Sequence, residues 1–249
     1  MPEFTSDALV LRTYKLGETS TIAVLLTRER GKLRAVARGA RSPRSRLNSL
    51  LQPLSEVRAT FYGRQGADLL RLGNCELLRS SFVAAGRLQG GLALSYFAEL
   101  LDAFAQEGEA EDAVYRLAAA VLRAAEDGGA SDVLSRYLEA WLLKLHGIYP
   151  PLDRCAACAQ PLPAGALRYH SASHGFACDA CAPAAGLVLD GEARATLTGI
   201  FGRPPAEQPG TLSAGAGALA GFHQDLISRH LERDLRSYRV LGDVARALR

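Results

Sequence analysis

Two Cys-x-x-Cys motifs constrain the folding of this chain most strongly, because four thiols brought to one point dictate the path of the backbone around them. The motifs are Cys155-Ala-Ala-Cys158 and Cys178-Asp-Ala-Cys181, and residues 159–177 separate them. Each motif directs two sulfur atoms at one ion, and two motifs complete a tetrahedron with Zn–S bonds of about 2.3 Å. The spacing predicts one structural Zn²⁺ bound by Cys155, Cys158, Cys178 and Cys181.

Two other interpretations of these cysteines remain open from the sequence. Either motif could be a redox-active pair, although such pairs come singly and lie between a strand and a helix. His170 and His174 lie between the motifs and could replace a cysteine as a ligand. A site of four cysteines has no open coordination position, so we expect the metal to support the fold and to perform no chemistry.

The first 80 residues have the pattern of a small β-barrel. Short runs of aliphatic and β-branched residues alternate with turns that contain glycine, such as Gly17, Gly31 and Gly63. Five strands of this length are enough to close an OB-type barrel. We therefore predict an OB-fold domain over residues 1–80, with strands near residues 8–11, 21–27, 33–37, 57–62 and 69–78.

After about residue 82, hydrophobic residues recur at every third or fourth position instead of at every second position. Leu94, Phe97, Leu101 and Phe104 follow this helical spacing, and a similar stripe begins at Leu134. We predict an α-helical domain over residues 81–249. Prolines, glycines and the four cysteines interrupt it, which indicates a zinc-finger insert at about residues 150–187. The fold class predicted for the whole chain is α+β.

A single last helix is predicted from about residue 218 onward, because leucine and phenylalanine residues form one apolar stripe as far as Leu235. A basic row accompanies this stripe. Acidic residues precede two of its arginines by four positions, so we interpret the row as a solvated helix face with ion pairs. A second DNA-binding surface is the alternative interpretation. The row consists of Arg229, Arg233 and Arg236.

Positive charge is concentrated in the N-terminal region. Residues 1–80 contain 14 Lys and Arg against 7 Asp and Glu, whereas the remainder contains 15 against 19. The densest segment is 28–46, which has one acid, Glu29, and eight bases. Alternation along a strand places Lys32, Arg34 and Arg38 on one face, and the basic run continues into a loop. We predict a nucleic-acid-binding surface at Lys32, Arg34, Arg38, Arg41, Arg44 and Arg46.

Single-stranded nucleic acid prefers a basic groove that also offers exposed aromatic rings for stacking. Tyr14, Phe61 and Tyr62 lie on the predicted strands and could serve this purpose. Each of them could equally belong to the barrel core. We infer contacts mainly to the phosphate backbone, with low sequence specificity.

No local motif of an enzyme is present. The chain has no phosphate-binding Gly-x-x-x-x-Gly-Lys-Ser/Thr loop, no His-Glu-x-x-His and no Gly-x-Ser-x-Gly. His223 and His230 are expected at the surface or at the edge of the core. No apolar run is long enough to cross a membrane, no signal peptide is recognisable, and the cysteines do not suggest a disulfide framework. We expect a cytoplasmic, non-enzymatic protein with no catalytic residues.

The chain resembles the RecO family of DNA repair proteins almost from end to end. The junction 142–150, which leads into the first cysteine motif, is similar to the family, although Ala159 follows that motif where glycine is expected. The remaining similar segments are residues 8–11, 17–18, 25–27, 31–32, 38–46, 51–54 and 235–241.

The resemblance implies an N-terminal OB-fold and a helical domain that carries a zinc finger. It also implies binding to single- and double-stranded DNA, annealing of complementary strands, and a role in recombination after DNA damage. The partners implied are RecR, in many systems RecF, and the C-terminal tail of single-stranded-DNA-binding protein, with RecA loaded onto the coated strand. A nucleoid-associated location in the cytoplasm would follow, with no membrane involved.

Three alternatives from other functional classes remain open at this stage. The first is a zinc-ribbon and OB-type nucleic-acid-binding factor in transcription or RNA metabolism, which would share the barrel, the cysteines and the basic strand. The second is a zinc-dependent hydrolase, which the closed set of four cysteines disfavours. The third is an adaptor that binds only proteins. Acceleration of strand annealing separates the repair protein from the first alternative, and salt-dependent DNA binding separates it from the third.

Overall fold

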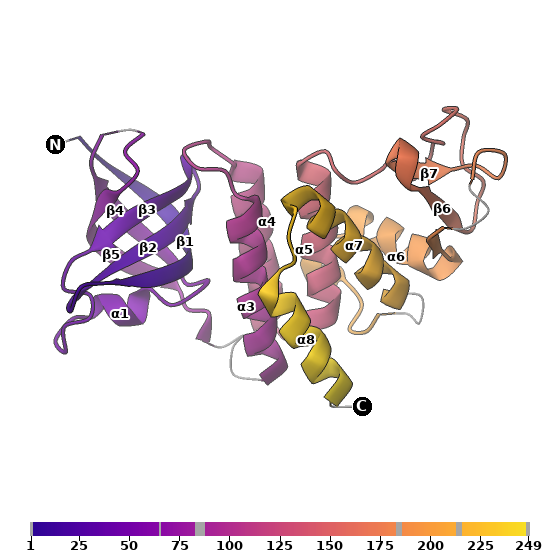
Figure 1. The fold of residues 1–249 in the computed structure, drawn as a ribbon. Helices are drawn as coiled ribbons and strands as arrows, with labels where there is room; N and C mark the ends of the chain where they lie inside the picture. Colours follow the sequence, from indigo (N-terminus) through magenta and orange to yellow (C-terminus); the bar gives the residue numbers. More distant parts are fainter. Residues whose placement is uncertain (1, 65, 83–87, 183–185, 213–215, 248–249) are drawn as a thin grey trace. The chain divides into compact units, whose positions relative to one another are not determined.

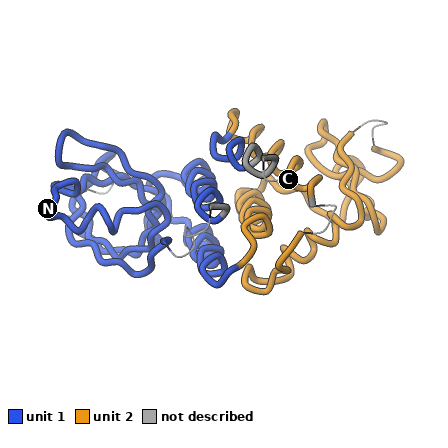
Figure 2. Tube along the Cα trace, turned by 90° about the horizontal axis from the view of Figure 1, so that it is seen from below, with its two compact units in different colours: residues 1–128, 235–249 blue, residues 129–234 orange. Residues whose placement is uncertain are grey.

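A computed structural model describes residues 2–64, 66–82, 88–182, 186–212 and 216–247. The chain divides into two compact units, one of residues 1–128 and 235–249 and the other of residues 129–234 (Figure 2). The predicted domain boundary after residue 80 concerns independent folding and stays a prediction. Within the described ranges, no helix has both the length and the apolar character that a bilayer crossing requires.

Five strands close a barrel in the first unit (Figure 1). Neighbouring strands pair in the order β1-β2-β3-β5-β4, and β4 returns to pair with β1. This order, with a short helix α1 between β3 and β4, is that of an OB-fold and confirms the predicted fold class. The elements are β1 (Glu3–Leu16), β2 (Ser20–Thr27), β3 (Gly31–Ala37), α1 (Leu47–Leu50), β4 (Glu56–Tyr62) and β5 (Leu70–Arg79).

The barrel interior is filled by small and branched side chains that alternate along each strand. Phe61 is its largest member and is fully buried, with its ring centroid 5.1 Å from that of Phe4. Phe61 is therefore a core residue and offers no surface for stacking. Cys75 also belongs to this core, and burial raises the pKa of its thiol to about 11.

Three helices complete the first unit, namely α3 (Leu88–Phe104), α4 (Asp112–Glu126) and α8 (Arg236–Ala247). The segment after α3 runs beside the first half of β3. The Lys32 amide donates to Gln106 O at 2.9 Å, and the Gly108 amide donates to Lys32 O at 3.1 Å. This segment occupies hydrogen-bonding positions that β5 leaves open, because β3 and β5 pair only at residues 35 and 36 of β3.

Gly31 permits the close approach of this segment. It has φ of 61°, and a Cβ atom at this position would lie 1.8 Å from Glu109 O. A side chain is therefore excluded by strain and by collision with backbone.

The predicted continuous last helix is wrong. Helix α7 (Ala216–Leu231) ends before Glu232, which has φ of 53°, and α8 begins at Arg236. The amides of Arg236 and Ser237 donate to the Glu99 carboxylate on α3 at 3.1 and 2.8 Å. A carboxylate at a helix N-terminus satisfies amides that lack partners within the helix. Arg229, Arg233 and Arg236 consequently do not form one row, and Arg229 pairs with Asp225 at 2.9 Å.

The second unit contains the cysteines and three helices. Helices α5 (Ser131–Leu145), α6 (Gly191–Gly202) and α7 pack together. The cysteine segment forms a three-stranded sheet in the order β7-β6-β8. Residues 183–185 of the predicted insert lie outside the described residues. The sheet elements are β6 (Leu167–His170), β7 (Gly175–Ala177) and β8 (Val188–Leu189), with 3₁₀ turns at Ser171–Ser173 and Pro205–Glu207.

Four polar side chains form a hydrogen-bonded network inside the second unit. Glu139 accepts from Arg136 at 2.7 Å and pairs with His223 Nδ1 at 2.9 Å, and Tyr149 Oη lies 3.0 Å from His223 Nε2. Glu139 and His223 are both fully buried, so the expected position of His223 at the surface or core edge is wrong. Burial lowers the pKa of His223 despite the opposing effect of Glu139.

Candidate metal centre and nucleic-acid interface

The sulfur atoms of Cys155, Cys158, Cys178 and Cys181 lie within 4.8 Å of one another. The separation of Cys158 Sγ from Cys178 Sγ is 3.7 Å. A tetrahedral ion with bonds of about 2.3 Å requires sulfurs about 3.8 Å apart, so the spacing fits a four-sulfur metal site. The sequence-predicted cysteines are thus brought together by the fold as a group capable of holding a metal.

Backbone hydrogen bonds hold each motif in a tight turn. The Ala156 amide donates to Phe176 O at 2.8 Å, which ties the first motif to β7. The Ala182 amide donates to Cys178 O at 2.8 Å and closes the second motif. Backbone amides at Cys178 and Cys158 also lower the pKa of the Cys155 thiol to about 6. The neighbouring thiols, by contrast, raise the pKa values of Cys158 and Cys181, so without a metal Cys155 is the thiol that ionises most readily.

The histidines between the motifs are not members of this cluster. Among the described residues, the metal-capable group at this place contains only the four cysteines. His170 Nδ1 lies 2.6 Å from Ser173 Oγ and thus closes the local turn. His174 has φ of 50° at the end of the same turn. Both histidines shape the β6–β7 hairpin.

The basic residues on β3 are partly neutralised by acids from outside the barrel. Lys32 Nζ lies 2.6 Å from Asp102 O and 3.7 Å from Asp102 Oδ1, and its side chain is only 14% exposed. Arg34 pairs with Glu107 at 2.6 Å. Both acids lie about 70 residues further along the chain. The first two members of the predicted surface therefore share their charge with internal partners.

The remaining four predicted residues lie together on the segment between β3 and α1. Arg38, Arg41, Arg44 and Arg46 are all exposed. Within the part of the chain that the structure describes, none of the four is joined to an acid by an ion pair. Arg41 donates to Gly17 O at 3.0 Å, and its amide donates to Thr19 O at 2.8 Å. The β1–β2 turn thus anchors the segment, which we name the basic loop, residues 38–46.

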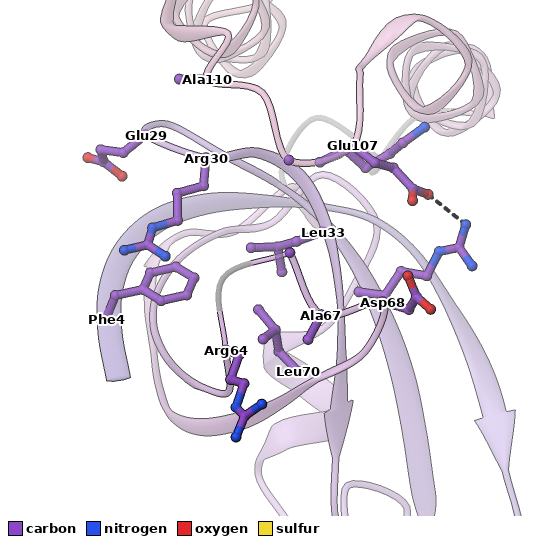
Figure 3. A pocket seen from close by; sticks show the side chains of 14 residues that line it. Phe4, Glu29, Arg30, Leu33, Arg64, Ala67, Asp68, Leu70, Glu107 and Ala110 are labelled. Atoms are coloured by element: carbon purple, nitrogen blue, oxygen red, sulfur yellow. Dashed lines mark hydrogen bonds and ion pairs between the residues drawn. The ribbon is translucent and has the colours of Figure 1, made fainter. Parts of the chain in front are cut away.

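A hollow of about 690 Å³ opens on the barrel beside β3 (Figure 3). The β2–β3 turn, the β4–β5 connection and the segment after α3 surround it. Arg30 lies over the ring of Phe4, with its Cζ atom 3.7 Å from the ring centroid, and Arg64 comes from the opposite side. Glu29, Asp68 and Glu107 supply acidic groups to the same hollow, so it is less positive than the basic loop.

Two Arg–Tyr pairs on the barrel surface, of which Tyr14 is exposed and Tyr62 half-buried, were missed by reasoning from the sequence. The Cζ atom of Arg12 lies 4.8 Å from the Tyr14 ring centroid, and that of Arg71 lies 4.6 Å from the Tyr62 centroid. The Arg12-x-Tyr14 alternation could have indicated the first pair. The second pair joins different strands, so only their register reveals it.

Comparison with known proteins identifies the family. The model for "Recombination protein O N terminal" matches residues 1–81, and that for "Recombination protein O C terminal" matches residues 88–239. The chain is 33% identical over 243 residues to the DNA repair protein RecO of Koribacter versatilis, covering 95% of this chain and 97% of that one.

Two further relatives carry the same name. The DNA repair protein RecO of Streptomyces coelicolor is 33% identical over 258 residues, with coverage of 97% and 99% of the two chains. That of Desulforudis audaxviator is 34% identical over 254 residues, with coverage of 97% of both. With an OB-type barrel, a helical region and a four-cysteine cluster in the same order as the matched segments, the chain belongs to the RecO family of DNA repair proteins.

Proposed function

We propose that this protein is a non-enzymatic recombination mediator that binds single- and double-stranded DNA, anneals complementary strands and helps to load RecA with RecR. The observation that carries the proposal is the basic loop. Its four exposed arginines have no acid partner in the described ranges, so their charge is available to a polyanion. The relatives, which are named DNA repair proteins, support DNA as that polyanion.

Most of the proposed contacts with DNA come from the four arginines of the basic loop, Arg38, Arg41, Arg44 and Arg46. Lys32 and Arg34 contribute less, because Asp102 and Glu107 already bind them. Each neutralised phosphate releases counterions, so log K falls with log salt by about 0.7 per contact on a single strand. Four contacts predict a slope near −3, and six predict a slope near −4.

Annealing follows from the same electrostatics. Two complementary strands repel each other as polyanions, and this repulsion slows their encounter. A protein that binds strands through arginines screens the repulsion and raises their local concentration. No covalent step and no nucleotide hydrolysis is needed.

The metal that we assign to the four cysteines is one zinc ion. When bound, zinc would crosslink the two cysteine motifs and stabilise the three-stranded sheet. Its role is structural, because four protein ligands leave no position for substrate.

The partners that we propose rest on the family. They are RecR, RecF in many systems, and the C-terminal tail of single-stranded-DNA-binding protein, and the site of action is the nucleoid in the cytoplasm. None of these partners is assigned to particular residues.

The decisive variant replaces Arg38, Arg41 and Arg44 with alanine. Fluorescence anisotropy over a salt series should give weaker binding to all DNA sequences and a salt slope reduced by about 2. A matched control replaces the exposed, ion-paired Arg58, Arg116 and Arg229, which removes the same charge elsewhere. If both variants behave alike, or if the basic-loop variant binds as the unmodified protein does, the assignment of the loop is refuted.

Annealing of complementary labelled oligonucleotides, with and without the cognate coating protein, tests the mediator role. Acceleration that persists on coated strands is expected. Absence of acceleration on bare strands would contradict the annealing proposal.

A further inference from the structure

One row of outward-facing side chains crosses all five strands of the barrel. Directly paired residues project to the same side of a sheet, and their neighbours in sequence, such as Ala35, Phe61 and Leu70, fill the interior. In the order of strand pairing β1, β2, β3, β5 and β4, the row consists of Tyr14, Ile22, Val36, Arg71 and Tyr62.

Each end of the row carries a tyrosine ring with a guanidinium group over it. Tyr14 is 42% exposed, and the Arg12 side chain above it is 51% exposed. Arg71, which lies over Tyr62, is also exposed. A guanidinium group held over a ring offers a flat stacking surface. The charge of Arg12 is shared with Asp102, whose carboxylate lies 3.0 Å away.

Tyr62 is positioned by a glycine on the neighbouring strand. A Cβ atom added to Gly73 would lie 2.3 Å from Tyr62 Cε2, so the ring rests against the backbone of β5. Covering a glycine in a sheet is a structural role that aromatic rings often have. That role explains the position of the Tyr62 ring, but it does not explain the other pair, Arg12 and Tyr14.

The centre of the row is apolar and its border is cationic. Ile22 and Val36 are half-buried between the tyrosine rings. Arg34 lies on β3 two positions before Val36 and is paired with Glu107, whereas Arg38 directly follows β3 and belongs to the basic loop, so the available cation beside the row is Arg38. Four spacings of about 4.8 Å between paired strands give the row a length of roughly 19 Å.

We propose that this row binds unpaired bases of single-stranded DNA, with the Arg12–Tyr14 and Arg71–Tyr62 pairs as two base-stacking sites. The inference rests on the proposed function and adds to it a preference for single strands. Unpaired bases expose their faces and stack on aromatic rings and guanidinium planes, whereas bases in a duplex are already stacked on each other. The basic loop, by contrast, binds phosphates that both forms of DNA share.

The test measures the affinity of the full-length protein for (dT)20 and for a hairpin duplex at one salt concentration. The variant Tyr14→Leu with Arg71→Lys keeps the charge and removes one ring and one guanidinium plane. It should lower single-strand affinity by about tenfold or more while duplex affinity changes less than twofold. Tyr14→Phe keeps a ring and should retain single-strand affinity. Arg58→Lys, an exposed arginine on β4 that pairs with Asp7, is the matched control.

A second measurement detects directly whether DNA bases stack on the protein. An oligonucleotide that contains 2-aminopurine should lose fluorescence when bound by the unmodified protein and should lose less when bound by the double variant. Thermal melting of each variant checks that the barrel remains folded.

The outcomes separate this inference from the proposed function. Equal losses of single-strand and duplex affinity in the double variant, or no loss of either, would overturn the stacking sites alone. An unmodified protein that binds neither form of DNA would overturn the proposed function and this inference with it.

Discussion

Ala159 closes the first cysteine motif by donating its amide to Cys155 O at 2.8 Å, and it does so with φ of 61°. This left-handed conformation costs a residue with a side chain about 1–2 kcal/mol. Ala159 is also the position at which the sequence departs from the glycine expected in the family. The departure therefore places strain at the metal site without removing a ligand.

We predict that Ala159→Gly raises the free energy of unfolding of the zinc-loaded protein by about 1 kcal/mol. Denaturant unfolding at fixed zinc concentration measures the change. Ala157→Gly, within the same motif but without positive φ, is the control and should not stabilise the protein. A destabilised Ala159→Gly variant would contradict the assigned conformation.

The purified protein should contain about one zinc per chain, and Cys155→Ser should reduce this content and lower the melting temperature. The reason is that a lost thiolate leaves three ligands where the fold presents four. Cys75→Ala is the matched control and should retain the metal, because Cys75 lies in the barrel core. Zinc-free protein with four freely titratable thiols in its native state would refute the metal site.

Gly31→Ala should destabilise the first unit by at least about 2 kcal/mol, because backbone strain adds to a collision with Glu109 O. Gly17→Ala provides an unusually close control. Gly17 has the same φ of 61°, but nothing lies within 4 Å of its added Cβ. The substitution Gly17→Ala should therefore lower the free energy of unfolding by only about 1 kcal/mol. Equal effects of the two substitutions in chemical unfolding would mean that the segment after α3 does not pack against Gly31.

Stability should fall as the pH drops below about 6.5, partly because of His223. Burial lowers the pKa of His223 in the folded protein, so the unfolded chain takes up a proton at a pH where the folded chain does not. This favours unfolding by at most about 1.4 kcal/mol per pH unit for one proton.

The variant His223→Asn isolates this contribution. It should be less stable than the unmodified protein at pH 7.5, because Tyr149 loses its partner, but it should lose less stability between pH 7.5 and 5.5. His230→Gln, at an exposed position on the same helix, should keep the full pH dependence. Since all three proteins retain the cysteines, effects of pH on the metal cancel in the comparison. Parallel pH profiles for His223→Asn and the unmodified protein would exclude His223 as the titrating group.

Local patterns in the sequence determined the elements whose physics is local. The spacing of Cys155, Cys158, Cys178 and Cys181 was sufficient to predict that their sulfurs meet, because a two-residue spacer already turns the chain back on itself. Alternating residues and glycine-marked turns predicted the five strands, because successive side chains of a strand point to opposite faces and only one face lines the barrel interior. Excess charge in residues 28–46 predicted the nucleic-acid-binding surface that we propose.

Contacts between distant residues were decided only by the tertiary structure. Asp102 and Glu107 neutralise Lys32 and Arg34, which moves the available charge to the basic loop. Alternation could not say whether Tyr14 or Phe61 faces outward, because closure of the barrel selects the face. The turn at Glu232 contains neither glycine nor proline to mark it, and Glu99 stabilises the helix that follows. In each case a residue's role depends on a partner brought to it by the folded chain, and sequence separation carries no information about such a partner.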